Sequence, residues 1–261
     1  MNGDGPLILV VEDNPTYRDV MARQLSRMGY AVELFADGHQ AFAAYGRRRY
    51  DLLLTDCEMP KMDGYQLTAA IRAAEQASGD GRHLPIVAIT GNPVAGEIER
   101  CRAAGMDDCL PKPVLMPALR AQIQKWLPRA SAALPPASLG QAADEGGNTI
   151  LDLAVLKAIL GDNEAAARDM LQGFPAPSAA IVGEIEQAIA AGSSAAVAAA
   201  AHKLKSSARA IGANRLAAIC EKLEQAGKSN DREALGQAAL LLTPSFEEVL
   251  ARIRLPAGVS S

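Results

Sequence analysis

The sequence has few cysteines, no excess of basic residues and no long hydrophobic run. Its four cysteines, Cys57, Cys101, Cys109 and Cys220, are scattered without a CxxC or Cys/His pattern, so we expect reduced thiols rather than a disulfide framework or a zinc site. The formal net charge of −4 argues against a protein that binds nucleic acid through an overall positive field. No apolar run approaches the length of a membrane span, and the first residues lack a signal-peptide pattern. We therefore expect a cytoplasmic protein with no membrane segment in this chain.

The first half of the chain alternates short apolar segments with amphipathic helical ones. The apolar segments are typical of buried strands, and they lie at residues 7–11, 31–35, 52–56, 85–90 and 109–110. Helical spacing of apolar residues follows each of them. Five such alternations predict an α/β domain with a doubly wound, five-stranded parallel sheet that helices cover on both faces.

Polar side chains lie at the end of four of these predicted strands or directly after it. They are Glu12 and Asp13 after the first, Asp56 at the end of the third, Thr90 at the end of the fourth and Lys112 after the fifth. The carboxyl ends of parallel strands meet at one edge of a sheet, so we expect these groups to converge. Crowded carboxylates favour Mg²⁺, and a carboxylate can attack phosphorus to form an acyl phosphate. The pattern therefore predicts phosphoryl transfer.

Several motifs in order give this half a family resemblance. They are Glu12-Asp13, the Asp56 strand with Asp-x-x-Met-Pro and Asp63-Gly64, Thr90, Gly105-Met106-Asp107-Asp108, and Lys112-Pro113. Residues 6 to about 127 resemble the receiver domain of two-component response regulators, which has a flavodoxin-like fold.

This resemblance implies a role for each matching residue. Asp56 would be the phosphoacceptor, Lys112 would pair with the phosphoryl group and Thr90 would hydrogen-bond to it. Mg²⁺ would be held by Glu12, Asp13, Asp56 and the backbone carbonyl of Glu58. The peptide bond before Pro113 would be cis. We place the receiver domain at residues 1–127.

Residues 128–149 lack apolar periodicity and are rich in alanine, proline, glycine and small polar residues, which is typical of a flexible linker. From residue 150 onward the pattern is helical, with several amphipathic segments on short connections. We expect an all-α, four-helix-bundle domain at residues 150–255, followed by a tail at 256–261.

One predicted helix, residues 194–211, carries a histidine away from its apolar stripe. Helical geometry turns His202 toward solvent, and Lys205, Ser206 and Arg209 follow it on adjoining parts of the surface. A lone histidine is usually incidental. An exposed imidazole with cations one turn away could nevertheless accept a phosphoryl group.

The segment Ala201-His202-Lys203-Leu204-Lys205-Ser206-Ser207, followed by Ile211-Gly212-Ala213, is similar to the histidine phosphotransfer (HPt) domain. The resemblance implies that His202 is a second phosphoacceptor and that Lys205 supports it. Together the two domains resemble the C-terminal part of hybrid sensor histidine kinases.

We therefore expect phosphorelay signal transduction. Asp56 would accept a phosphoryl group from the histidine of a kinase, a separate protein or an upstream part of the same one, and exchange it with His202. A downstream response regulator receiver would take it from there. We expect a phosphotransfer protein without an ATP-binding kinase core of its own. An alternative is a response regulator whose C-terminal helices are a protein-binding output module. A DNA-binding output is disfavoured, since residues 149–261 hold 11 Lys and Arg against 12 Asp and Glu.

Overall fold

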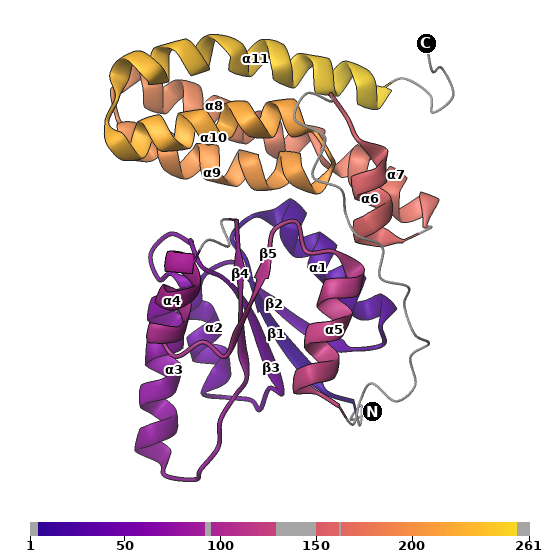
Figure 1. Cartoon of the computed structure of the whole chain (residues 1–261), viewed down its shortest axis with the longest axis vertical. Coiled ribbons are helices and arrows are strands. Elements are labelled where there is room, and N and C mark those ends of the chain that lie inside the picture. Colours follow the sequence, from indigo (N-terminus) through magenta and orange to yellow (C-terminus); the bar gives the residue numbers. More distant parts are fainter. Residues whose placement is uncertain (1–4, 92–94, 129–149, 162, 255–261) are drawn as a thin grey trace. The chain divides into compact units, whose positions relative to one another are not determined.

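The structure is a computed structural model that describes residues 5–91, 95–128, 150–161 and 163–254. The chain divides into two compact units, Met1–Gln141 and Ala142–Ser261, and each is described by itself (Figure 1). Residues 129–149 of the predicted linker and the predicted tail, 256–261, lie outside the described residues. Within the described parts of the chain, no helix is long and apolar enough to cross a membrane.

The first unit has the predicted parallel sheet, with strand order β2-β1-β3-β4-β5. All four strand pairs are parallel, which confirms the predicted fold class. The strands are β1 (Leu7–Val11), β2 (Ala31–Phe35), β3 (Leu52–Asp56), β4 (Ile86–Thr90) and β5 (Asp108–Pro111). The helices are α1 (Pro15–Arg27), α2 (Gly38–Tyr45), α3 (Gly64–Ser78), α4 (Ala95–Ala103) and α5 (Met116–Trp126).

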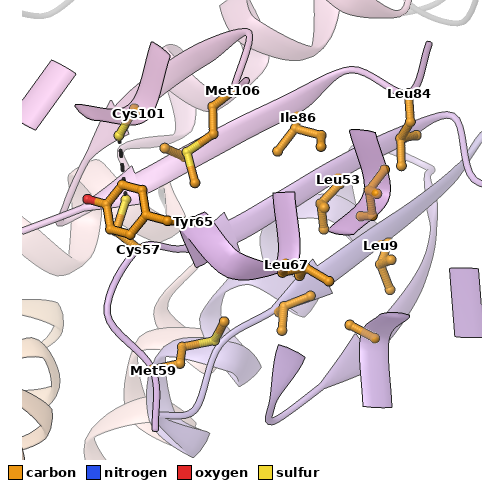
Figure 2. Close-up of a cluster of buried hydrophobic side chains, with 14 of the residues drawn as sticks. Leu9, Leu53, Cys57, Met59, Tyr65, Leu67, Leu84, Ile86, Cys101 and Met106 are labelled. Carbon is orange, nitrogen blue, oxygen red and sulfur yellow. Dashed lines mark hydrogen bonds between the residues drawn. The ribbon is translucent and has the colours of Figure 1, made fainter. Parts of the chain in front are cut away.

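The central strands are apolar because helices cover both faces of the sheet. Helices α1 and α5 lie on one face and α2, α3 and α4 on the other (Figure 1). Every residue of β3 and β4 is buried, as expected for parallel strands between two helical layers. Figure 2 shows the core on the α3 side, where Leu9, Leu53 and Ile86 pack against Leu67 of α3. This packing holds the ends of β1, β3 and β4 in register.

Local sequence signals start the helices beside the sheet edge. The side chain of Asn14 accepts a hydrogen bond from the backbone of Tyr17, and Pro15 is the first residue of α1. Asp63 and Gln66 form a reciprocal capping box at the start of α3. Position 64 has no room for a side chain, because a Cβ on Gly64 would lie 2.2 Å from the backbone oxygen of Asp56. The Asp-Gly motif therefore lets α3 begin directly against the end of β3.

The second unit is entirely helical within its described residues. Its helices are α6 (Leu153–Leu160), α7 (Glu164–Gly173), α8 (Pro175–Ala190), α9 (Ser194–Ala210), α10 (Asn214–Ser229) and α11 (Arg232–Arg254). Helix α9 packs between α8 and α10, while α11 packs on α10 and contacts α8. These four helices form the predicted bundle, and α6 and α7 lie beside it.

The turn between α9 and α10 depends on a glycine that the sequence motif contains. Gly212 has φ +76°, and a Cβ there would meet the backbone oxygen of Asp152 at 2.2 Å. The amide of Asp152 donates a hydrogen bond to the carbonyl of Gly212 at 2.9 Å. Only glycine combines this backbone conformation with so close an approach. The contact joins the start of α6 to the turn that aligns α9 with α10.

Candidate functional site

The groups predicted to converge in the first unit do so at the carboxyl edge of the sheet. In the parallel register Val11 pairs with Thr55, Asp56 with Ile89 and Thr90 with Pro111. The residues that end or follow these strands therefore lie in a row. They are Glu12 and Asp13 after β1, Asp56 of β3, Thr90 of β4 and Lys112 after β5.

Lys112 contacts two of the carboxylates at this edge. Its Nζ lies 2.8 Å from Oδ2 of Asp56 and 2.8 Å from Oε2 of Glu12, and only 2% of its side chain is exposed. Burial alone would lower the pKa of Lys112, but the charges of Asp56 and Glu12 raise it above its ordinary value. The ammonium group is therefore charged beside the oxygen that is predicted to accept a phosphoryl group.

Three carboxylates lie together at this edge, beside the ammonium of Lys112. One oxygen each of Glu12, Asp13 and Asp56 lies within 4.8 Å of the other two. Burial, and next the charge of Asp56, raise the pKa of Glu12 to about 8. The carboxylates of this cluster therefore disfavour one another's negative charge, and oxygen ligands at this spacing fit Mg²⁺. The residues present are suited to the predicted metal.

Two further predicted contributors lie at the same edge. Thr90 is buried at the end of β4, and its carbonyl accepts a hydrogen bond of 2.7 Å from the amide of Lys112. The amide of Glu58 is 3.4 Å from Oδ1 of Asp56, which places the Glu58 backbone beside the carboxylate. The metal-binding role of the Glu58 carbonyl stays a prediction. The Lys112–Pro113 peptide bond is cis, as expected.

Sequence reasoning missed two residues of α1 that position Lys112. The ring of Tyr17 lies 4.8 Å from Nζ of Lys112, and its hydroxyl accepts a hydrogen bond from the amide of Val114 at 2.5 Å. Nε2 of Gln24 donates to the Val114 carbonyl at 2.8 Å. These contacts fix the loop that carries Lys112. A polar Gln24 among the apolar positions of α1 was the signal available in the sequence.

In the second unit, His202 lies on α9 and faces a carboxylate of α10. Nδ1 of His202 is 3.0 Å from Oε1 of Glu224, and Nζ of Lys205 is 2.6 Å from Oε2 of the same group. The prediction that the imidazole points into open solvent is therefore wrong, because Glu224 holds Nδ1 and only 13% of the side chain is exposed. Helical spacing alone does not show what a neighbouring helix presents.

Glu224 is the functional candidate that sequence reasoning missed in this unit. Burial raises the pKa of its carboxyl, but His202, Lys205 and Lys228 lower it by more, so the pKa is well below its usual range. Nζ of Lys228 lies 2.8 Å from Oε1 of Glu224. Glu224 follows Cys220 and Leu223 on the apolar face of α10. An acidic residue on the apolar face of a predicted helix was the signal available in the sequence.

A second acidic residue of α10, Glu221, contacts the positive groups near His202. Nη2 of Arg209 is 3.2 Å from Oε2 of Glu221, and Nζ of Lys205 is 3.9 Å from the other oxygen of Glu221. Acidic residues of α10 thus align the cations of α9 beside the imidazole.

Comparison with known proteins identifies both units. Residues 8–124 match the response regulator receiver domain and residues 169–254 match the Hpt domain. The virulence sensor protein BvgS of Bordetella pertussis is 32% identical over 251 residues, which are 93% of this chain and 20% of that protein. The sensor histidine kinase RcsC of Salmonella typhi is 39% identical over 128 residues, 49% of this chain and 13% of that protein.

The chain thus spans a fifth or less of the length of these curated relatives. Among solved structures, it is similar to the receiver domain of the sensor histidine kinase PA1611 from Pseudomonas aeruginosa. That crystal structure has a magnesium ion coordinated in the active site cleft. The identity is 45%, with a TM-score of 0.43, over 47% of this chain and 97% of that one. The present chain therefore joins a response regulator receiver domain to an Hpt domain, and it resembles the C-terminal parts of hybrid sensor kinases.

Proposed function

We propose that this chain relays a phosphoryl group between Asp56 and His202. Asp56 receives the group from the histidine of a kinase, and His202 passes it to the receiver domain of a downstream response regulator. The proposal rests on one feature of the chain, which is that each unit holds a candidate phosphoacceptor beside a charged partner. The Asp56 carboxylate lies 2.8 Å from the buried ammonium of Lys112, and in the other unit Glu224 fixes the imidazole of His202. We place this relay in the cytoplasm, where kinase and regulator domains meet.

At the receiver site, an oxygen of Asp56 attacks phosphorus while the bond from phosphorus to the donor nitrogen breaks. Lys112 is placed to pair with a phosphoryl oxygen, because its Nζ already contacts Oδ2 of Asp56. The Thr90 hydroxyl, at the end of the next strand, is placed to donate a hydrogen bond to another. Both contacts strengthen as negative charge gathers on the transferring group.

Glu12, Asp13, Asp56 and the Glu58 carbonyl would hold Mg²⁺ at this edge. When bound, the metal neutralises oxygens of the phosphoryl group and the surplus negative charge of the site. Without it, the three carboxylates repel an incoming phosphate anion.

We expect acetyl phosphate to label Asp56 only when a divalent cation is present, because three clustered carboxylates repel the incoming phosphate anion. The measurement is incorporation of radiolabelled phosphate into the full chain with Mg²⁺ or with excess chelator. Asp13→Asn should need a higher Mg²⁺ concentration for half-maximal labelling, whereas Asp19→Asn, an exposed partner of Arg23, should match the wild type. Undiminished labelling in chelator contradicts the metal assignment.

At the helical site, Glu224 sets the tautomer of the imidazole. A carboxylate at Nδ1 favours the proton on that nitrogen, so Nε2 carries the lone pair that attacks phosphorus. The carboxylate also stabilises the positive charge that develops on the ring as the bond to phosphorus forms. Lys205, anchored on the other oxygen of Glu224, brings a positive charge close to the phosphoryl group. The acceptor is therefore a triad of His202, Glu224 and Lys205.

We expect Glu224→Ala to slow phosphoryl transfer to His202 by roughly tenfold to a hundredfold, because the ring loses its orientation. Glu224→Gln keeps a hydrogen-bond acceptor and should recover part of the rate. Gln225→Ala is the matched control, since Gln225 is an exposed residue of the same helix. Single-turnover transfer from a phosphorylated receiver measures all three. Equal rates for Glu224→Ala and Gln225→Ala contradict a positioning role for Glu224.

A further inference from the structure

Two buried cysteine thiols lie close together, and one of them belongs to the residue that follows Asp56. Cys57 follows Asp56 at the end of β3, and Cys101 lies on α4. They are 44 positions apart in sequence, yet their Sγ atoms are 3.7 Å apart (Figure 2). Cys57 is 1% exposed and Cys101 2%. The scattered cysteines of the sequence thus include a close pair that no spacing motif reveals.

A carboxylate completes a three-residue cluster with this pair. Glu97 lies one turn before Cys101 on α4, so the two side chains share a face of the helix. One ligand atom each of Cys57, Glu97 and Cys101 lies within 4.8 Å of the other two. Glu97 is only partly buried, which gives the cluster a route from solvent.

Tyr65 of α3 holds the carboxylate of this cluster in place. Its hydroxyl donates a hydrogen bond to Oε1 of Glu97, and the guanidinium carbon of Arg100 lies 4.0 Å from the centre of its ring. Supporting contacts of this kind orient the ligands of a metal site. Neither residue takes part in phosphoryl transfer as described above.

We propose that Cys57, Glu97 and Cys101 bind a zinc ion, in a site separate from the magnesium carboxylates. Tetrahedral Zn²⁺ with bonds to sulfur of about 2.3 Å places two thiolates about 3.8 Å apart, close to the separation of the Sγ atoms. Zinc accepts two thiolate sulfurs together with one carboxylate oxygen, whereas the thiolates are poor ligands for Mg²⁺. Binding releases the two thiol protons to solvent, and a water molecule takes the fourth position.

A disulfide fits the same pair less well. Its sulfurs bond at about 2.05 Å, so they would have to approach each other by roughly 1.7 Å within the cluster of buried side chains that surrounds them. Close packing resists such a movement. A disulfide also gives Glu97 no role. The zinc site, in contrast, joins α4 to the end of β3 through the residue after Asp56.

Cobalt is the probe for this site, because thiolate ligands give it charge-transfer absorption that carboxylates do not. The reduced full chain is titrated with Co²⁺ in a large excess of Mg²⁺, which occupies the carboxylates at the sheet edge. We expect one Co²⁺ per chain with thiolate charge-transfer bands, and loss of these bands when Zn²⁺ is added. Cys101→Ala should abolish them. Cys109→Ala, at a cysteine outside the cluster, should keep them.

Glu97→Gln is the second variant, at a partly exposed position where folding is not at risk. It should weaken cobalt binding tenfold or more while the bands stay thiolate in character. Urea unfolding followed by the fluorescence of Trp126 checks that each variant folds. Absence of thiolate bands in the wild type overturns the proposal, and so does their persistence in Cys101→Ala. Unchanged affinity in Glu97→Gln overturns the role of the carboxylate.

Discussion

Asp56→Asn abolishes transfer of phosphate from the cognate kinase to His202 and to the downstream regulator. The amide is neutral and a poor nucleophile, so no acyl phosphate forms at the end of β3. His202→Gln has a different result, because it leaves Asp56 able to accept phosphate but removes the nitrogen that passes it on. We expect this variant to accumulate label at Asp56 and to lose onward transfer. Gel autoradiography of kinase, chain and regulator in one mixture separates the two outcomes.

A mixture of the two variants tests whether the receiver of one molecule can reach the Hpt domain of another. Asp56 in His202→Gln and His202 in Asp56→Asn together supply one complete route, so onward transfer returns if docking between molecules occurs. His39→Gln, in α2 of the receiver, is the control and should behave as the wild type. Normal onward transfer by His202→Gln removes this histidine from the mechanism. The helical unit would then be better explained as a protein-binding output module.

Lys112→Met destabilises the metal-free receiver by about 3 kcal/mol, because it leaves the buried Glu12 and Asp56 carboxylates without their ammonium. Mg²⁺ should restore much of the lost stability, since the metal offsets the same charges. Trp126 is the single tryptophan of the chain and lies on α5. Its fluorescence during urea unfolding therefore reports on this unit alone, with and without Mg²⁺.

Lys125→Met is the matched control for that experiment. Lys125 also pairs with a carboxylate, at 2.6 Å from Asp108, but 58% of its side chain is exposed. Exposed pairs contribute about 1 kcal/mol or less, so we expect a small change that Mg²⁺ does not reverse. If Lys112→Met unfolds at the same urea concentration as Lys125→Met, the ammonium does not balance the carboxylates in the folded protein.

Much of the receiver site could be predicted because its residues follow patterns that are local in sequence. Each of Glu12, Asp56 and Lys112 comes at or just after a strand that apolar composition identifies. Parallel topology then brings strand ends to one edge without further information. The capping of α1 by Asn14 and of α3 by Asp63 was equally local. The positions of these residues were therefore predictable, and their contacts followed from the fold.

The contacts that could not be predicted join residues that lie far apart in the sequence. Glu224 lies 22 positions from His202, and only the packing of α10 on α9 brings its carboxylate to Nδ1. Cys57 and Cys101 meet because α4 packs over the end of β3. Periodicity says which face of a helix is buried, but not which polar group of the partner helix meets it. This is why His202 was expected in open solvent.

The most direct test of the relay is to map phosphate on the full chain after incubation with radiolabelled acetyl phosphate and Mg²⁺. This donor forms an acyl phosphate on an aspartate, so label on a histidine has to pass through Asp56. The account predicts two kinds of label in the wild type, a base-labile one on Asp56 and an acid-labile, alkali-stable one on His202, with neither in Asp56→Asn. Phosphate on His202 in Asp56→Asn, or none on His202 in the wild type, would contradict it.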